Sequence, residues 1–193
     1  GIGGSGMSSI AKYLKQKGYR VEGYDQRISY ITNLLENDGV RTYQNYEDFI
    51  YEKDVIYIIS SAVNLDDTFL KNFKKNKNVI SRPNFFRELS NEKDIIGITG
   101  THGKTSTTAL VSHIFQFNNK NVSFIYGGVS SFGYLGGHCG EDNLPLILET
   151  DEAFNTFKNI NIKDLIVTNI DNDHLYFYLY LINISEHTRR RLI

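Results

Sequence analysis

The chain has little of what would cross-link a protein or hold it in a membrane. Its 193 residues include one cysteine, Cys139, which rules out a disulfide within the chain and fits a reducing compartment. No apolar run reaches the ~20 residues that a membrane-spanning helix needs. No signal peptide precedes the first motif, so we expect a cytoplasmic protein.

An excess of charge of either sign is also missing. The 21 lysines and arginines are balanced by 22 aspartates and glutamates, which gives a net charge of -1. Because DNA, RNA and anionic membranes attract basic surfaces, we expect neither a nucleic acid nor a membrane as partner. The one basic run, at residues 189–191, is most simply a solvated end of the chain.

What the chain does contain is a glycine-rich loop between a strand pattern and a helix pattern. An apolar run at residues 95–98 precedes the loop, and a helical apolar pattern at residues 110–115 follows it. Glycines let backbone N–H groups turn toward an anion, a lysine reaches the outer phosphates, and a threonine hydroxyl can ligate Mg²⁺. The sequence therefore predicts a phosphate site made of Gly100, Thr101, His102, Gly103, Lys104, Thr105 and Ser106.

The spacing of this loop departs from the strict phosphate-loop pattern. That pattern places a glycine five residues before Gly103, where this chain has Ile98, and Gly97 lies one residue too early. The alternative is a strand-to-helix turn that uses glycine only for packing. We favour phosphate binding because Lys104 and Thr105 directly follow the last glycine.

A second glycine motif opens the sequence. Gly1, Gly3 and Gly6 fit the pattern G-x-G-x-x-G, a helical pattern follows, and a strand candidate at residues 19–24 ends on Asp25. In a Rossmann half, an acid about 20 residues after the glycines contacts a ribose. This order predicts a nucleotide site, and the alternative is a helix-start turn with no ligand. The strand that should lead into the loop is not in the sequence, so we expect a fragment.

Helix and strand patterns alternate through the rest of the first half. The expected elements are a helix ending before Gly39, strands at residues 40–42, 55–59 and 79–80, and a helix at residues 69–73. Small residues that include Ser61 follow the apolar strand at 55–59, which suits a ligand crevice, although a tight connection explains them equally well. Arg82-Pro83 and the charged residues 91–94 mark a boundary.

These patterns predict an α/β fold with two parts. Residues 1–92 are expected to form a Rossmann-like parallel-sheet domain that binds a nucleotide. Residues 93–193 are expected to form a truncated central α/β domain like that of a phosphate-loop ATPase.

Two later strands are expected to deliver possible metal ligands. A strand at residues 146–148 leads to Glu149, and a carboxylate at a strand end near a phosphate loop is where a Mg²⁺ ligand is needed. The alternative is an ordinary acidic turn. A strand at residues 165–167 leads toward His174, which could be a second metal ligand, a phosphate contact or a loop histidine.

The stretch between these strands and the tail of the chain are less regular. A strand is expected at residues 122–126, and the six glycines in residues 127–140 favour a flexible surface loop in which His138 faces solvent. The apolar-aromatic residues 176–181 are either a buried strand or a departure of the reading frame from its ancestor.

Five motifs occur in a fixed order along the chain. They are Gly-Ile-Gly-Gly-Ser-Gly-Met at 1–7, Ser-Ser-Ala-Val at 60–63, Gly-Thr-His-Gly-Lys-Thr at 100–105, Glu-Thr-Asp-Glu at 149–152 and Thr-Asn-Ile-Asp-Asn-Asp-His at 168–174. Together they resemble the Mur ligase family from residue 1 to about residue 178. His102 favours its alanine-adding branch or the related murein-peptide ligases, and the shortened phosphate loop is typical of the family.

The resemblance implies a bacterial, cytoplasmic, three-domain enzyme of peptidoglycan synthesis. Such an enzyme uses ATP and Mg²⁺ to join L-alanine to the carboxylate of UDP-N-acetylmuramate through an acyl phosphate. Carried over by position, the UDP-substrate residues are Gly3, Gly4, Ser5, Gly6, Met7, Asp25 and Ser61. The ATP residues are those of the phosphate site, with Lys104 as the catalytic residue, and the metal ligands are Thr105, Glu149 and His174.

Departures from the family pattern limit what these residues are expected to do alone. The family usually has Ser-Asp-Gly-Ser-Phe where this chain has Ala-Phe-Asn-Thr-Phe at 153–157, and an aspartate where it has Tyr176. The adenine-holding segments and a C-terminal domain are not in the sequence. We therefore expect at most weak nucleotide binding and no ligation by the 193 residues.

Two alternatives remain at this point. One is a non-catalytic nucleotide-binding remnant. The other is a different ligase of the superfamily, such as a murein-peptide ligase or a folylpolyglutamate-type enzyme, although the latter usually has asparagine in place of His102. The sequence does not define the oligomeric state.

Overall fold

The computed structural model describes residues 1–45, 48, 52, 54–60, 78–131, 133–150 and 160–170. In chain order the elements are α1 (Ser5–Gln16), β1 (Glu22–Tyr24), α2 (Tyr30–Asn37), β2 (Arg41–Tyr43), β3 (Tyr57–Ile59), β4 (Val79–Ser81), α4 (Arg82–Glu92), β5 (Ile95–Thr99), α5 (Lys104–Phe117), β6 (Ser123–Val129), β7 (Leu135–His138), β8 (Leu146–Glu149) and β9 (Ile162–Val167). None of the described helices is long and apolar enough to cross a bilayer.

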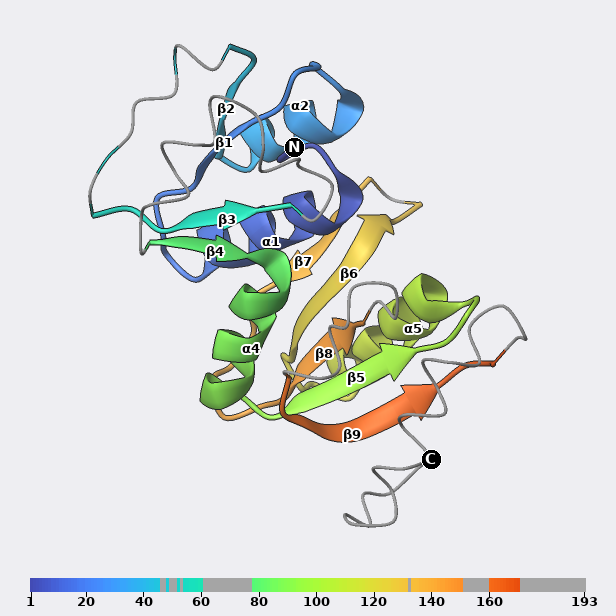
Figure 1. The fold of residues 1–193 in the computed structure, drawn as a ribbon. Helices are drawn as coiled ribbons and strands as arrows, with labels where there is room; N and C mark the ends of the chain where they lie inside the picture. Colours follow the sequence, from blue (N-terminus) through green and yellow to red (C-terminus); the bar gives the residue numbers. More distant parts are fainter. Residues whose placement is uncertain are drawn as a thin grey trace.

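The described strands form one large sheet and two short pairs. The five-stranded sheet has the order β7-β6-β8-β5-β9, and all its neighbours are parallel except β6 and β7. The pairs β1–β2 and β3–β4 are both parallel. Figure 1 shows α2 and the pair β1–β2 at one end of the molecule, β5, β8 and β9 toward the other end, and α1 beside β6 and β7 between them. The predicted α/β class is confirmed.

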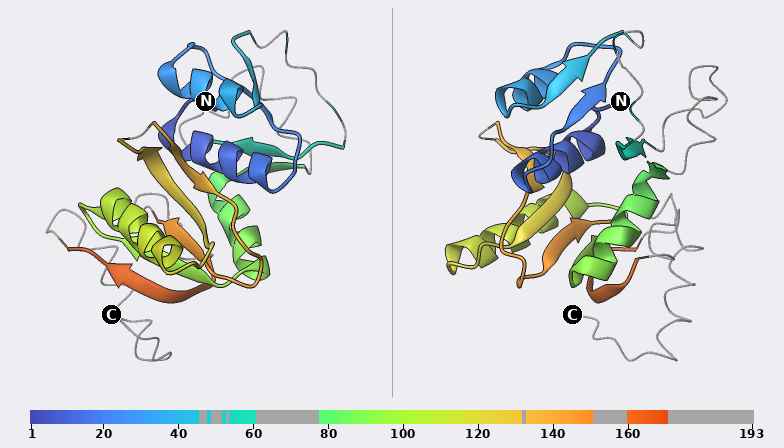
Figure 2. Two further views of the ribbon diagram at one scale, coloured as in Figure 1. Left: turned by 180° about the vertical axis from the view of Figure 1, so that it is seen from behind. Right: turned by 90° about the vertical axis from the view of Figure 1, so that its left-hand side faces the viewer.

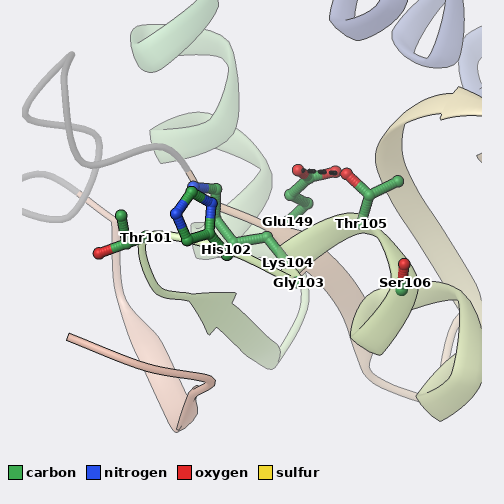
Figure 3. Close-up of a pocket in the computed structure, with 7 residues that line it drawn as sticks. All are labelled: Thr101, His102, Gly103, Lys104, Thr105, Ser106 and Glu149. Carbon is green, nitrogen blue, oxygen red and sulfur yellow. Dashed lines mark hydrogen bonds between the residues drawn. The ribbon is translucent and has the colours of Figure 1, made fainter. Parts of the chain in front are cut away.

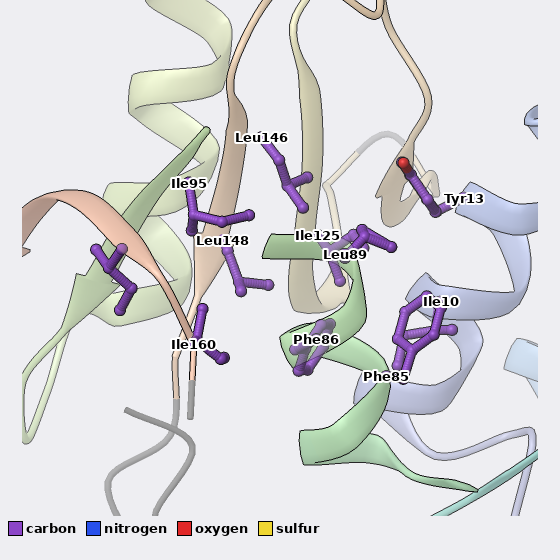
Figure 4. Close-up of a cluster of buried hydrophobic side chains, with 11 residues drawn as sticks. Ile10, Tyr13, Phe85, Phe86, Leu89, Ile95, Ile125, Leu146, Leu148 and Ile160 are labelled. Atoms are coloured by element: carbon purple, nitrogen blue, oxygen red, sulfur yellow. The ribbon is translucent and has the colours of Figure 1, made fainter. Parts of the chain in front are cut away.

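Helices cover both faces of the large sheet (Figure 2). On one face, α5 packs Val111 and Phe115 over Ile98, Val122 and Ile147. The other face carries a larger cluster from α1, α4 and the strands (Figure 4), which consists of Ile10, Tyr13, Phe85, Phe86, Leu89, Ile95, Ile125, Leu146, Leu148, Ile160 and Ile162. Apolar residues alternate between the two faces because successive side chains of a strand point in opposite directions.

The larger cluster joins residues from both expected domains. Ile10 and Phe85 come from before residue 93, and Ile125 and Leu148 come from after it. The division into residues 1–92 and 93–193 stays a prediction.

Local signals explain where several helices begin and end. Ser29 and Thr32 form a reciprocal cap at the start of α2, and Gly39 follows its end with a φ of 79°. At the start of α4, the Ser81 side chain accepts from the Asn84 N–H, and Pro83 lies in the first turn, where its missing N–H costs nothing. Arg82-Pro83, predicted as part of a boundary, is therefore the beginning of a helix.

The predicted flexible loop at residues 127–140 is wrong. β6 continues to Val129, and β7 follows in the same hairpin. Its glycines are needed for packing, because a Cβ built on Gly137 would lie 2.0 Å from the carbonyl oxygen of Ser9 in α1. His138 lies on β7 with its ring stacked on Phe124. Burial lowers the pKa of His138, and the positive charge of Lys12 lowers it further.

The predicted buried strand at residues 55–59 is shorter and less buried than expected. Only Tyr57–Ile59 pairs in a sheet, and Ile56 is 66% exposed. Ser61, the helix predicted at residues 69–73, His174 and the aromatic stretch at 176–181 lie outside the described residues.

Candidate functional site

The predicted phosphate loop connects the end of β5 to the start of α5. Gly100 has a φ of 136° and Gly103 a φ of 80°, both in the region that side-chain-bearing residues avoid. These two glycines let the chain turn sharply enough for α5 to begin at Lys104 without a side-chain cap. The first amides of α5 therefore form an open helix N-terminus, which attracts anions.

Residues after β9 hold the loop in place. Asn169 accepts a hydrogen bond from the His102 N–H at 2.8 Å through its side-chain oxygen, and its own carbonyl oxygen accepts from the Thr101 N–H at 3.3 Å. The hydroxyl of Thr168 donates to the carbonyl oxygen of His102 at 2.6 Å. The segment that was expected to supply His174 thus supplies two loop-supporting residues that sequence reasoning had not assigned.

A pocket of about 330 Å³ opens above this loop (Figure 3). It is lined by Thr101, His102, Gly103, Lys104, Thr105, Ser106 and Glu149. The Lys104 ammonium donates to the carbonyl oxygen of Gly100 at 2.6 Å, so the lysine lies over its own loop. The size is at the lower end of the ~300–1,000 Å³ of small-molecule sites, which suits a phosphate chain.

Glu149 lies at the pocket wall with both carboxylate oxygens occupied. Thr105 donates its hydroxyl to Oε1 at 2.8 Å, and the Gly127 N–H donates to Oε2 at 2.7 Å. Glu149 ends β8 and Thr105 lies in the first turn of α5, and the two elements are adjacent because β5 and β8 pair in parallel. Neither Gly127 nor its N–H contact is marked by a sequence pattern, so it was missed.

The oxygen atoms of Thr105 and Glu149 at this wall of the pocket are of the kind that binds Mg²⁺. The ion prefers oxygen ligands and is commonly bound through one or two carboxylates together with substrate phosphates. Thr105 and Glu149 supply one hydroxyl and one carboxylate that already meet at 2.8 Å. The described residues contain no group of three or more histidine, cysteine, aspartate or glutamate side chains that could hold a metal by itself.

The first glycine motif folds against the end of β1. The Gly3 N–H donates to Asp25 Oδ2 at 2.8 Å, and the Ile2 N–H donates to the Tyr24 carbonyl oxygen at 2.9 Å. Asp25 therefore holds the loop itself, and a ribose contact for it stays a prediction. α1 begins directly after Gly4, which provides no side-chain cap.

Arg82 is a further residue at this motif that sequence reasoning missed. A Cβ built on Gly6 would lie 2.5 Å from Nη1 of Arg82, so the guanidinium lies on the first turn of α1. Arg82 immediately follows β4, and ligands of parallel sheets bind beyond the carboxyl ends of the strands. That position was the signal available in the sequence.

Comparison with known proteins bears on the family of this chain. The model described as "Mur ligase family, catalytic domain" matches residues 1–94. The chain is 35% identical over 179 residues to the UDP-N-acetylmuramate–L-alanine ligase of Hydrogenobaculum sp., an alignment that covers 92% of this chain and 40% of that protein. The chain belongs to the Mur ligase family.

Solved structures of Mur ligases share its fold. The UDP-N-acetylmuramate-alanine ligase of Thermotoga maritima matches with a TM-score of 0.78 and 31% identity, covering 95% of this chain and 43% of that chain. A UDP-N-acetylmuramate:L-alanyl-gamma-D-glutamyl-meso-diaminopimelate ligase from Neisseria meningitides matches with a TM-score of 0.77 and 21% identity, covering 97% and 64%. Of the full length of the Hydrogenobaculum ligase, this Mur ligase chain spans less than half.

The structure of this Mur ligase brings most of the predicted site residues into two groups. One group is the phosphate loop with Glu149. The second is the stretch Gly3, Gly4, Ser5, Gly6 and Met7 at the start of α1, with Asp25 bonded to it. The predictions for Ser61 and His174 fall outside the described residues, so they stay predictions.

Proposed function

We propose that this Mur ligase chain provides the substrate-binding and nucleotide-binding parts of an ATP-dependent ligase of bacterial peptidoglycan synthesis. The enzyme joins L-alanine to the carboxylate of UDP-N-acetylmuramate in the cytoplasm. The observation that carries the proposal is the Thr105–Glu149 contact of 2.8 Å beside the lysine-bearing loop. The 35% identity to an L-alanine ligase supports the choice of substrates.

In this proposal, the first glycine motif holds the UDP group. The open N-terminus of α1 and the guanidinium of Arg82 both attract negative charge, and the diphosphate of UDP carries such charge. Asp25 keeps the motif in shape through the Gly3 N–H. Gly3, Gly4, Ser5, Gly6 and Met7 line this site, and Ser61 is proposed as a further contact.

The phosphate loop holds the triphosphate of ATP. The amides at the start of α5 and the Lys104 ammonium offset the charge that develops on the phosphate oxygens during transfer. Lys104 would exchange its present acceptor, the Gly100 carbonyl oxygen, for a phosphate oxygen. Thr105 and Glu149, with His174 as a proposed third ligand, would hold Mg²⁺, which neutralises phosphate charge when bound.

The proposed reaction has two steps. A carboxylate oxygen of UDP-N-acetylmuramate attacks the γ-phosphorus of ATP in line, which releases ADP and forms an acyl phosphate. The amine of L-alanine, once deprotonated, then attacks the acyl carbon, and inorganic phosphate leaves with the C–O bonding electrons. Most of the rate gain comes from orientation of the two substrates.

A ligand-binding experiment tests the proposal. We expect the 193-residue chain to bind UDP-N-acetylmuramate and, more weakly, Mg²⁺ with a non-hydrolysable ATP analogue, as measured by isothermal titration calorimetry. Lys104→Ala should weaken only the binding of the ATP analogue with Mg²⁺, and folate should not bind to the chain. Absence of binding to both nucleotides by the unmodified chain would refute the proposal.

Catalysis by the chain is tested separately. We expect no L-alanine-dependent release of ADP when it is incubated with UDP-N-acetylmuramate, ATP and Mg²⁺, because the relatives are more than twice as long. ADP release that requires L-alanine would show instead that these residues suffice for ligation.

A further inference from the structure

Gly127 lies on β6 beside Glu149, which lines the pocket above the phosphate loop. Its N–H donates to Oε2 of Glu149 at 2.7 Å, while Thr105 occupies the other carboxylate oxygen. The backbone of Gly127 therefore orients the carboxylate that is proposed to bind the metal. A residue of any type could donate this hydrogen bond, so the bond alone does not require a glycine.

Ser5 of the first glycine motif also lies close to Gly127. A Cβ built on Gly127 would lie 3.5 Å from the hydroxyl oxygen of Ser5 and 3.8 Å from Oε2 of Glu149. Ser5 is the first residue of α1, and Glu149 is the last residue of β8. The missing side chain of Gly127 thus leaves a space that has Ser5 on one border and Glu149 on another.

We propose that this space is where the two ligands meet, and that Gly127 keeps it open as a positioning residue. The inference rests on the proposed function and assigns the junction to one residue. The ligands that meet there are the carboxylate of a UDP-linked substrate, held by the motif containing Ser5, and the terminal phosphate of ATP, held beside Glu149. Reacting atoms must approach to about 3–3.5 Å, which a side chain between them prevents.

The substitution Gly127→Ala can test this because the ligand-free protein should tolerate it. Gly127 does not have a positive φ, and the new methyl group would make contacts at ordinary van der Waals distances. The neighbouring Gly128, by contrast, has a φ of 154°, so alanine there would strain the backbone whatever the space. Gly127→Ala therefore fills the junction while preserving the N–H bond to Glu149.

The experiment titrates the 193-residue chain and its Gly127→Ala variant with UDP-N-acetylmuramate, with Mg²⁺ and adenylyl-imidodiphosphate, and with each ligand in the presence of the other. We expect the variant to bind each ligand alone nearly as the unmodified chain does. With the nucleotide already bound, its affinity for UDP-N-acetylmuramate should fall by at least ~5-fold relative to the unmodified chain. Equal affinities of both chains for the second ligand would overturn the inference and leave the proposed function intact.

A measurement on the unmodified chain does not depend on the variant. In ¹H–¹⁵N spectra, the Gly127 amide should shift on addition of either ligand alone, while the Gly18 amide at the far end of α1 should not. A Gly127 amide that responds to one ligand only would place the junction elsewhere and overturn the inference. Failure of the unmodified chain to bind either ligand would instead overturn the proposed function, and this inference with it.

Discussion

Among glycine-to-alanine substitutions in the phosphate loop, Gly100→Ala should distort the loop backbone most. Gly100 has a φ of 136°, and a Cβ built on it would lie 2.0 Å from the hydroxyl oxygen of Thr168. The backbone N and O atoms of Asn169 would lie 2.9 and 3.0 Å from the same Cβ. These are the residues that support the loop through His102, so the added methyl group pushes against its support.

The expected loss of stability has two parts. A residue with a side chain in this backbone region costs about 1–3 kcal/mol, and overpacking of a filled site costs about 1–3 kcal/mol more. We therefore expect Gly100→Ala to lower the free energy of unfolding by about 2–6 kcal/mol. That is a large share of the ~5–15 kcal/mol that a folded protein typically has.

A second substitution separates the steric part from the backbone part. Thr168→Ala removes the atom nearest to the new methyl group, whereas Thr168→Ser keeps it. In the Gly100→Ala background, Thr168→Ala should therefore recover about 0.5–3 kcal/mol relative to its effect in the unmodified chain, and Thr168→Ser should recover nothing. The rescue should stay incomplete because the Asn169 backbone cannot be removed.

Each comparison is a double-mutant cycle of four chains: the unmodified chain, the two single variants and the double variant. Urea unfolding followed by far-ultraviolet circular dichroism gives the free energy of unfolding of each chain, since the sequence has no tryptophan to serve as a fluorescent probe. A Gly100→Ala loss of less than about 1 kcal/mol would contradict the argument from backbone strain. Equal rescue by alanine and serine at position 168 would contradict the argument from the Thr168 hydroxyl.

Three further predictions concern single side chains. Lys104→Ala should weaken binding of Mg²⁺ and adenylyl-imidodiphosphate by about 10–100-fold through the loss of a charged donor, with UDP binding unchanged in the same calorimetric titration as control. Arg82→Ala should do the reverse: it should weaken binding of UDP by about 10-fold or more and leave binding of the ATP analogue unchanged. Equal losses of affinity for both ligands would contradict a local role of Arg82. Burial raises the pKa of Tyr13 from 10.0 to about 12, so the unfolded chain loses this proton first, and the free energy of unfolding should be unaffected by it below pH 10 and fall by about 1.4 kcal/mol per pH unit as pH rises from 10 toward 12. Tyr13→Phe should flatten this part of the stability profile and, because the buried hydroxyl has no partner among the described residues, should raise stability at neutral pH by about 1 kcal/mol, as urea unfolding at several pH values would show.

Short-range patterns predicted the parts of the fold that depend on local chemistry. The strand before Gly100 and the helix after Gly103 follow from the change of hydrophobic period at the glycine loop. The pocket around Lys104 was predictable for the same reason, because a loop, a lysine and a helix N-terminus are contiguous in the chain. Glu149 could be added because parallel strands present their carboxyl ends at one edge.

Residues whose roles depend on distant packing could not be predicted in this way. Glycines in 127–140 indicated a flexible loop, but Gly137 is bare because α1 lies against it. Asn169 supports His102 from 67 positions away, and nothing in its local sequence indicates this. Arg82 was predicted only as part of a boundary together with its neighbour Pro83, whereas the role proposed for it depends on its contact with Gly6.

The separation of the two proposed ligand sites is set by helix–sheet packing. Ser9 of α1 donates its hydroxyl to the carbonyl oxygen of Tyr126 at 2.6 Å, and Tyr126 directly precedes Gly127 on β6. The bare backbone of Gly137 on β7 lets α1 approach the sheet closely enough for this bond. The helix that begins at the first glycine motif is thus anchored one residue from the strand position that orients Glu149. Any shift of α1 along β6 would therefore change the distance between the proposed UDP site and the proposed phosphate site, so the close packing of α1 on Gly137 of β7 sets the geometry that the proposed reaction needs.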